Sequence, residues 1–277
     1  MKVVSLFSGC GGLDYGFKKA GFDIVWANDN FNDACLTYQK NIGKHIVCED
    51  IFKIKLSDIP DADILIGGPP CQGFSGIGKR NPDDVRSTLV WRYLDIVKKV
   101  KPKVFLLENV TGIRSAKTPD GKMVLDELEK QFNLLGYKTN IHLLNAADYG
   151  VPQRRRRVFI VGNTLGLDIS APKSTHGEEG SGLKKWVGSK EALFDLSKPT
   201  DEGIASYTKP PTNDFLKYLR PEGLKNTDLH ITPYSSETDR IIMSHVKPGG
   251  NYMDVPDSVS TKRIMYFKKT GGRTTTY

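Results

Sequence analysis

Short apolar runs alternate along the first 165 residues with segments in which apolar residues recur at helical spacing. Strand-like runs are found at residues 3–7, 24–27, 64–66, 104–107, 139–143 and 158–161. Helical spacing is found at residues 13–20, 32–40, 87–100 and 122–135. Strands that alternate with helices of this length are typical of a mostly parallel sheet covered on both faces. We therefore expect an α/β fold, doubly wound and Rossmann-like, over residues 1–165.

The pattern changes after residue 165. Residues 166–277 are rich in Gly, Pro, Ser, Thr and Lys and hold only short apolar stretches. Neither an internal repeat nor a long low-complexity tract is evident. We expect a second, smaller and irregular region over residues 166–277.

Length and composition narrow the class of protein. The chain has 277 residues, of which 38% are hydrophobic, enough for a sizeable buried core. No apolar run approaches the roughly 20 residues that cross a bilayer, and the amino terminus does not read as a signal peptide. Cys10, Cys35, Cys48 and Cys71 are far apart and form no CxxC pair, so neither a metal site nor a redox dithiol is expected. A cytoplasmic protein with no membrane partner and no metal is the expectation.

Positive charge is concentrated in one stretch. The formal net charge is +8, and residues 154–157 are four consecutive arginines beside an apolar run. Such a run is typical of a surface that binds a polyanion such as nucleic acid, but also of a solvated basic face. On charge alone, both interpretations stay open.

The first loop that can bind a ligand follows the first strand. In an open parallel sheet, ligands bind beyond the carboxyl ends of the strands. The segment "LFSGCGGLDYGF" places Gly9, Gly11 and Gly12 there, where bare backbone allows either a close ligand or tight packing of strand against helix. Asp29 follows the run at residues 24–27, and Asp50, in "CEDIF", is expected at the end of a further strand between that run and residues 64–66. Carboxylates at such positions can accept hydrogen bonds from ribose hydroxyls. A nucleoside-containing cofactor is favoured, with NAD and S-adenosylmethionine both open.

A second loop carries a cysteine in an unusual setting. In "DILIGGPPCQGFSG", Cys71 follows a buried strand on a backbone stiffened by Pro69 and Pro70. A free cysteine is more often an ordinary buried residue. A core cysteine does not require a Gly-Gly-Pro-Pro turn before it, however. We therefore expect Cys71 to stand just beyond the sheet edge, beside the cofactor crevice.

A third loop, "VFLLENV", ends another buried strand with Glu108 and Asn109. An ionised carboxylate is costly to bury, so the protonated, hydrogen-donating form of Glu108 is favoured there. The alternative is that Glu108 caps a helix or pairs with an arginine. Both residues are expected beside the loop that carries Cys71.

Taken in chain order, five segments resemble the signature blocks of the cytosine-5 DNA methyltransferases. They are "LFSGCGG", "GGPPCQGFS", "DVRSTL", "LLENV" and "NAADYGVPQRRRRVFIVG". The resemblance implies a two-domain enzyme that uses S-adenosylmethionine, leaves S-adenosylhomocysteine, flips a cytosine out of double-stranded DNA and methylates its carbon 5. It further implies a modification methyltransferase of a restriction-modification system in a bacterial cytoplasm, with residues 166–277 as the target-recognition region.

The resemblance also implies catalytic roles. Cys71 would be the nucleophile that adds to carbon 6 of cytosine, which makes carbon 5 reactive enough to take the methyl group. Protonated Glu108 would stabilise negative charge towards ring nitrogen 3, with Asn109 helping to orient the pair. Arg157 would face the base carbonyl, and Arg155 would face phosphate or the active-site loop.

Binding roles are carried over in the same way. The expected cofactor-binding residues are Phe7, Gly9, Gly11, Gly12, Asp29, Asp50 and Pro70. Gln153 would support the active-site loop and contact DNA, while Lys79 and Arg80 lie in a loop expected to close over the DNA as a lid. Asn30 departs from the pattern, because several relatives have a tryptophan there against the adenine.

A second departure lies at the other end of the chain. The sequence stops at "KKTGGRTTTY", before a further Arg- and Pro-containing block and a last motif that family members carry. One subunit of a split enzyme, a truncated form and a chain without its tail all stay open. We expect residues 1–277 alone to bind S-adenosylmethionine weakly and to methylate slowly until a second subunit supplies the missing part.

Three other functions compete with DNA methylation. One branch of the family methylates a cytosine in transfer RNA with the same constellation of residues. A non-catalytic DNA-binding subunit of a split methyltransferase would also retain the basic segment. A nicotinamide-dependent dehydrogenase is compatible with the glycine turn but gives no reason for "PPCQ" beside "ENV". The DNA sequence that is recognised cannot be read from these motifs.

Overall fold

The computed structural model describes residues 1–70, 88–199, 203–220, 222–228, 230–231, 237–246 and 254–259. The expected nucleophile Cys71 and the expected lid residues Lys79 and Arg80 lie outside the described residues. Contacts divide the chain into two compact units. The first comprises Met1–Asn145 and Arg156–Lys173, and the second comprises Ala146–Arg155 and Ser174–Tyr277. The functional domains expected on either side of residue 165 stay a prediction.

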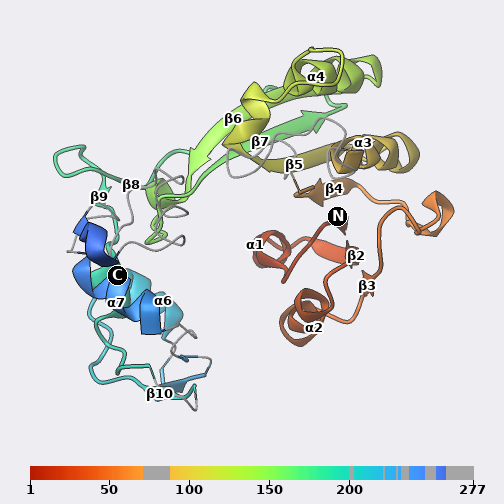
Figure 1. Ribbon diagram of the computed structural model, residues 1–277. Helices are drawn as coiled ribbons and strands as arrows, with labels where there is room; N and C mark the ends of the chain where they lie inside the picture. Colours follow the sequence, from red (N-terminus) through yellow and green to blue (C-terminus); the bar gives the residue numbers. More distant parts are fainter. Residues whose placement is uncertain are drawn as a thin grey trace. The chain divides into compact units, whose positions relative to one another are not determined.

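The first unit is built on a seven-stranded sheet with the order β3-β2-β1-β4-β5-β7-β6, which can be followed in Figure 1. Its strands are β1 (Lys2–Leu6), β2 (Asp23–Asp29), β3 (Ile46–Cys48), β4 (Ile64–Gly67), β5 (Val104–Val110), β6 (Lys138–Asn145) and β7 (Arg156–Asn163). β3, β2, β1, β4 and β5 run parallel, whereas β7 pairs antiparallel with both β5 and β6. The expected α/β fold with a mostly parallel sheet is confirmed.

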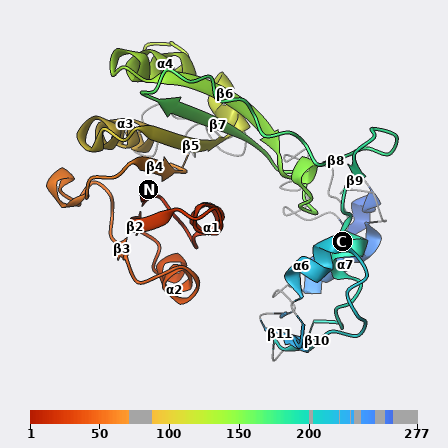
Figure 2. The same ribbon diagram turned by 180° about the vertical axis from the view of Figure 1, so that it is seen from behind.

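Among the described residues of this unit, four α-helices accompany the sheet: α1 (Gly12–Lys19), α2 (Asn32–Asn41), α3 (Thr88–Val100) and α4 (Val124–Leu134). Successive strand residues point to opposite faces, so Val4 and Leu6 join the core under α3 and α4 while Val3 joins a separate cluster under α1. Figure 2 shows the same order of strands and helices from behind. Both faces are therefore covered, as expected for a doubly wound sheet.

The antiparallel direction of β7 has a simple geometrical basis. Parallel neighbours need a crossover connection, whereas antiparallel neighbours can be joined by a short loop. Residues 146–155 join β6 to β7 without a crossover helix. β6 is an edge strand, and its side chains are exposed or half-buried over most of its length. The reversal places the carboxyl end of β5 beside the amino end of β7, with Val110 opposite Arg157.

Among its described residues, the second unit has little regular structure. Apart from short 3-10 helices, the elements found there are β8 (His176–Gly177), β9 (Lys184–Lys185), α5 (Ser189–Leu193), β10 (Ala205–Ser206), α6 (Asp214–Leu219), β11 (Asn226–Thr227) and α7 (Glu237–His245). Each strand is two residues long, and the strands form two separate two-stranded sheets. This agrees with the short apolar stretches of the sequence. In the described part of the chain, no helix combines the length and the apolar character that a bilayer span requires.

Candidate active site

The sequence left two interpretations open for the glycine turn after β1, close approach of a ligand or tight packing against a helix. Two of its glycines differ in this respect. Gly11 has φ 90°, and a Cβ there would lie 2.6 Å from Cγ1 of Ile42 and 2.9 Å from Cδ2 of Tyr38, so Gly11 allows tight packing against α2. Gly9 has φ 55°, and no atom of the described residues outside its chain neighbours lies within 4 Å of the position of its Cβ. The backbone around Gly9 therefore leaves room for a ligand.

Phe7, at the start of this turn, is one of two non-glycine residues with positive φ among the described residues, at φ 53°. A bulky side chain rarely adopts this conformation, and such strained positions gather at functional sites. Gly12 begins α1, and within the part of the chain that the structure describes a Cβ on it would also meet no atom of another segment within 4 Å. The turn thus presents bare or strained backbone at the carboxyl edge of β1.

Asp29 ties this turn to the next strand. Its Oδ2 accepts a hydrogen bond from the backbone N–H of Gly9 at 2.8 Å, and its Oδ1 accepts one from the N–H of Phe31 at 2.9 Å. The carboxylate therefore holds the glycine turn against the end of β2. Each carboxylate oxygen has a second lone pair, so the expected contact with a ribose hydroxyl stays a prediction. Asn30 adjoins Phe31, whose side chain is exposed.

Asp50 follows β3 and stabilises a turn, because its Oδ1 accepts a hydrogen bond from the N–H of Phe52 at 3.0 Å. An arginine that the sequence analysis did not single out secures this turn from α3. Arg92 donates to the carbonyl oxygens of Ile51 and Ile54, at 3.1 Å and 2.9 Å, and its guanidinium lies over the ring of Phe52 at 5.8 Å. Arg92 lies in an amphipathic helix, and its sequence position does not distinguish it from a solvent-exposed arginine, so these contacts could not be predicted.

A buried polar network lies beneath the glycine turn, and no pattern in the sequence indicated it. Asp14 of α1 is fully buried, and its carboxylate accepts hydrogen bonds from Ser5 at 2.9 Å and from the hydroxyl of Tyr38 at 2.8 Å. The Tyr38 hydroxyl also lies 3.0 Å from Nε2 of His45. Burial raises the pKa of Asp14 and lowers that of His45. Since Tyr38 also contacts Gly11, this network fixes α2 against the turn.

Glu108 and Arg157 form an ion pair at the other side of the edge. Nε of Arg157 lies 2.9 Å from Oε1 of Glu108, and the two side chains are 20% and 28% exposed. The sequence left three roles open for Glu108: a protonated donor, a helix cap or a partner of an arginine. The structure shows the pair with an arginine. The protonated, donating form of Glu108 stays a prediction. Gly68 makes room for this carboxylate, because a Cβ on Gly68 would lie 3.0 Å from Oε2.

Asn109 holds the segment that leads to Cys71. Its side chain is 2% exposed, its Nδ2 donates to the carbonyl oxygen of Pro69 at 3.1 Å, and its Oδ1 accepts from the N–H of Val110. Pro69 is buried and Pro70 is exposed. The end of β5 therefore lies beside the start of the Cys71 loop, where the sequence placed it.

The arginine run is divided between the two units. Arg156 and Arg157 begin β7 in the first unit, whereas Gln153, Arg154 and Arg155 belong to the second. The side chains of residues 153–156 are all exposed. Gln153 and Arg155 are thus available to a partner, and their expected DNA contacts stay a prediction.

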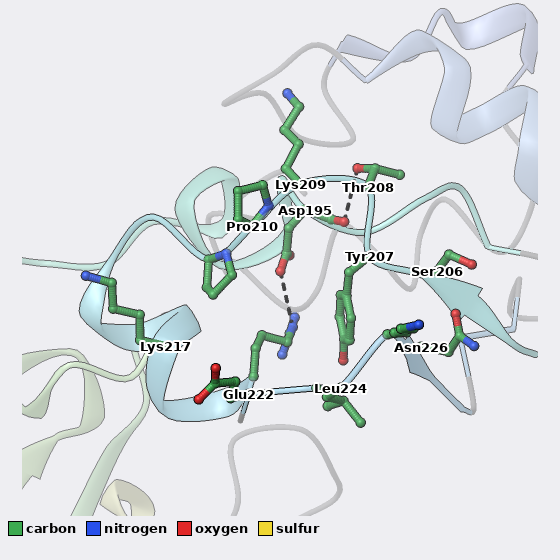
Figure 3. Close-up of a pocket in the computed structure, with 14 residues that line it drawn as sticks. Asp195, Ser206, Tyr207, Thr208, Lys209, Pro210, Lys217, Glu222, Leu224 and Asn226 are labelled. Carbon is green, nitrogen blue, oxygen red and sulfur yellow. Dashed lines mark hydrogen bonds and ion pairs between the residues drawn. The ribbon is translucent and has the colours of Figure 1, made fainter.

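A cavity of about 830 Å³ lies within the second unit. Figure 3 shows Asp195 among the residues that line it, with Lys209 and Lys217 extending outward. Arg220 pairs with Asp195, because its Nε lies 3.2 Å from Oδ2 of Asp195, and its guanidinium lies 4.4 Å from the ring centre of Tyr207. Asp195 is fully buried, and its Oδ1 has no hydrogen-bond partner among the described residues. Nothing in the sequence signalled this pair.

The described residues contain no group of three or more His, Cys, Asp or Glu side chains that could hold a metal ion.

Comparisons with known proteins identify the family of this chain. The model of the C-5 cytosine-specific DNA methylase family matches residues 1–270. The chain belongs to this family. The type II methyltransferase M.NgoFVII of Neisseria gonorrhoeae is 41% identical over 234 residues, which cover 82% of this chain and 62% of that protein. M.MthTI of Methanothermobacter thermautotrophicus, another type II methyltransferase, is 44% identical over 203 residues, covering 72% of this chain and 58% of the relative. The chain thus spans less than two thirds of the length of these relatives.

Solved structures with a similar fold are also methyltransferases. A protein from an Escherichia coli prophage, assigned as a DNA modification methyltransferase, superposes with a TM-score of 0.70 at 27% identity, over 94% of this chain and 79% of that one. The Dnmt2 methyltransferase of S. pombe superposes with a TM-score of 0.50 at 26% identity, over 61% of this chain and 53% of that one.

Proposed function

We propose that this chain transfers a methyl group from S-adenosylmethionine to carbon 5 of a cytosine in double-stranded DNA. Membership of the C-5 cytosine-specific DNA methylase family supports this reaction. The observation that carries it is the Glu108–Arg157 pair at 2.9 Å, next to the backbone that leads to Cys71. Ring nitrogen 3 and the carbonyl oxygen of cytosine are adjacent acceptors on one edge of the base. A protonated Glu108 and Arg157 would offer two adjacent donors that match this edge.

The glycine turn and the neighbouring strand ends fit the cofactor. Gly9 leaves space where a side chain would stand, and Asp29 and Asp50 supply carboxylates at the ends of β2 and β3. Phe7, Gly11, Gly12 and Pro70 would complete the site. When bound, S-adenosylmethionine supplies an electrophilic methyl group and leaves as S-adenosylhomocysteine. The residues named here would bind and orient it.

Cys71 would activate the base. Its thiolate adds to carbon 6 of cytosine, a sulfur–carbon bond forms, and the electron pair of the ring double bond becomes available at carbon 5 for attack on the methyl group. Loss of the proton from carbon 5 then restores the double bond and breaks the sulfur–carbon bond. Asn109 fixes the carbonyl of Pro69, two residues before Cys71, and so would limit the motion of the nucleophile.

Glu108 would stabilise the intermediate. Negative charge spreads to ring nitrogen 3 as the thiolate adds, and a donor placed there lowers the barrier. In the ion pair the carboxylate accepts from Arg157. Donation to the base therefore requires that Glu108 gain a proton when the cytosine enters and Arg157 turn towards the base carbonyl.

Base flipping would bring the cytosine to this site. The enzyme cannot reach carbon 5 while the base is stacked in the duplex. Rotating the base out of the duplex costs a few kcal/mol in lost stacking and pairing. Exposed Gln153 and Arg155 would contact the DNA and compensate part of this cost. Lys79 and Arg80 would assist from the loop after Cys71.

Bisulfite sequencing of plasmid from cells that express this chain tests the reaction and reports the target sequence. Running it with and without the neighbouring reading frame tests the need for a second subunit. We expect methylated cytosines at one sequence motif. Unmodified plasmid in both cultures would contradict the proposal.

Covalent trapping tests the mechanism. A duplex with 5-fluorocytosine at the target should form a stalled adduct with the wild-type chain and none with Cys71→Ser. An adduct formed equally by the variant would exclude Cys71 as the nucleophile. An adduct with transfer RNA but none with DNA would favour RNA methylation.

A further inference from the structure

The loop that joins β6 to β7 is attached to the second unit. Residues 146–155 lie between two strands of the first unit but are grouped with the second unit by their contacts. The loop begins with a short 3-10 helix, Ala146–Tyr149. The backbone N–H of Thr175 donates to the carbonyl oxygen of Asp148 at 2.9 Å, just before β8. The two residues predicted to contact DNA in this loop, Gln153 and Arg155, are therefore carried by the second unit.

One indole ring contacts both the start and the end of this loop. Trp186 follows β9, is half-buried, and donates from Nε1 to Oδ1 of Asp148 at 3.0 Å. The guanidinium carbon of Arg154 lies over the same ring, 4.9 Å from its centre. Asp148 and Arg154 are six residues apart, so Trp186 connects the two sides of the turn between them.

The turn itself packs closely on β8. Gly150 has φ 87°, and a Cβ on it would lie 2.8 Å from Cε1 of His176. The N–H of Ala146 donates to the carbonyl of Arg155 at 3.0 Å, which closes the base of the loop. A loop held at its base, at its turn and across its width by Trp186 has little freedom to change the direction of Arg155.

We propose that Trp186 is a positioning residue that fixes the 146–155 loop for DNA binding, and that Arg154 acts on Trp186 and not on a DNA phosphate. This inference rests on the proposed function. Arg155, the next residue, is the phosphate ligand of the pair. The adjacent arginines thus have different tasks, although the sequence makes them look equivalent.

The dependence of DNA binding on salt distinguishes the two tasks. Each phosphate contact by a cation contributes a slope of about −0.9 to a plot of log affinity against log salt concentration for duplex DNA. A residue that only positions the loop changes affinity without changing that slope. The salt dependence therefore distinguishes a residue that contacts a phosphate from a residue that only positions the loop.

The experiment compares Arg154→Gln, Arg155→Gln, Trp186→Leu and the double variant Arg154→Gln/Trp186→Leu in the full chain. The probe is a duplex that carries the motif found by bisulfite sequencing, titrated at four salt concentrations. Trp186→Phe is the matched control, because it keeps a ring under Arg154 and removes only the N–H to Asp148. Binding of S-adenosylmethionine and the thermal unfolding midpoint identify any variant that fails to fold.

We expect Arg154→Gln and Trp186→Leu each to weaken DNA binding about three- to tenfold, the range of a cation–π contact and its neighbouring hydrogen bond, with the wild-type salt slope. The double variant should be no weaker than Trp186→Leu, since both changes remove one contact. Arg155→Gln should make the slope shallower by about 0.9. Trp186→Phe should lie between wild type and Trp186→Leu.

A shallower slope for Arg154→Gln, equal to that of Arg155→Gln, would overturn the inference, as would unchanged DNA affinity for Trp186→Leu. These results differ from failure of the proposed function itself. In that case the wild-type chain would leave plasmid unmodified and form no adduct with 5-fluorocytosine.

Discussion

Glu108 and Arg157 lie 49 positions apart in the sequence, yet Oε1 of one and Nε of the other are 2.9 Å apart at the carboxyl edge of the sheet. Antiparallel pairing of β5 with β7 brings them together. The pair adjoins Gly68 and the segment that leads to Cys71. Two motifs that are separate in the sequence thus form one side of the candidate active site.

The first prediction concerns the donor role of Glu108. Glu108→Ala should lower the single-turnover methylation rate by about 10² to 10³, the range for the loss of one hydrogen-bond donor to developing negative charge. The rate of Glu108→Gln should fall less than that of Glu108→Ala, because its amide N–H can donate to ring nitrogen 3. The affinity for S-adenosylmethionine serves as the control and should be unchanged. Equal losses in the two variants would show that donation from residue 108 does not drive the rate.

The second prediction compares two glycines of the same turn. Gly11→Ala should lower the free energy of unfolding by about 1–3 kcal/mol or more, because its Cβ would overlap Ile42 and Tyr38. Gly9→Ala should cost about 1–2 kcal/mol, for the positive φ alone, but it should weaken cofactor binding at least tenfold by occupying the open space.

Calorimetric titration with S-adenosylmethionine and thermal unfolding of both variants check this contrast. Wild-type cofactor affinity in Gly9→Ala would mean that the space beside Gly9 is not the cofactor site. Wild-type stability in Gly11→Ala would contradict the packing account of Gly11.

The third prediction is a pH dependence of stability. Burial lowers the pKa of His45, so the unfolded chain binds a proton at a higher pH than the native protein does. Stability from the neutral imidazole is present above about pH 6.5 and is lost as the pH falls from there through the folded pKa. Burial raises the pKa of Asp14, so the stability that depends on Asp14 is present at low pH and is lost as the pH rises, opposite to that of His45. Of the charged neighbours of His45, Asp14 and Asp23 raise its pKa and Lys18 lowers it.

His45→Gln keeps a donor for Tyr38 and removes the titration. Urea unfolding of wild type and variant between pH 7.5 and pH 5 checks the prediction, and the wild type should lose more stability over this range. Parallel pH profiles would show that His45 does not contribute.

The fourth prediction concerns the buried pair of the second unit. Asp195→Ala leaves Arg220, whose side chain is 13% exposed, without its carboxylate partner, and an uncompensated buried charge costs about 3–5 kcal/mol. Lys217→Ala is the matched control, because its side chain is exposed. Trp26 and Trp91 lie in the first unit, so urea unfolding is followed by the fluorescence of Trp186 in a chain in which both are replaced by phenylalanine, and the signal then reports on the second unit. Equal midpoints for Asp195→Ala and Lys217→Ala would contradict the assigned role of the pair.

Much of the first unit could be predicted from the sequence, because its signals are local. Apolar runs of strand length and segments of helical spacing alternate over residues 1–165, and each expected strand and helix is present within a few residues. The turn residues are local signals as well. Gly9 and Gly11 adopt positive φ, which the lack of a side chain permits, and Asp29 ends its strand where the spacing placed it.

Tertiary structure decided which of these residues meet. The direction of β7 depends on its neighbours and not on its own apolar pattern, so the partner of Glu108 could not be chosen among the arginines. Asp14 and Tyr38 read as ordinary helix residues, and only the packing of α1 against α2 buries them together. Consecutive arginines likewise have no intrinsic difference. Arg154 is distinguished from Arg155 only because Trp186, distant in sequence, lies under its guanidinium.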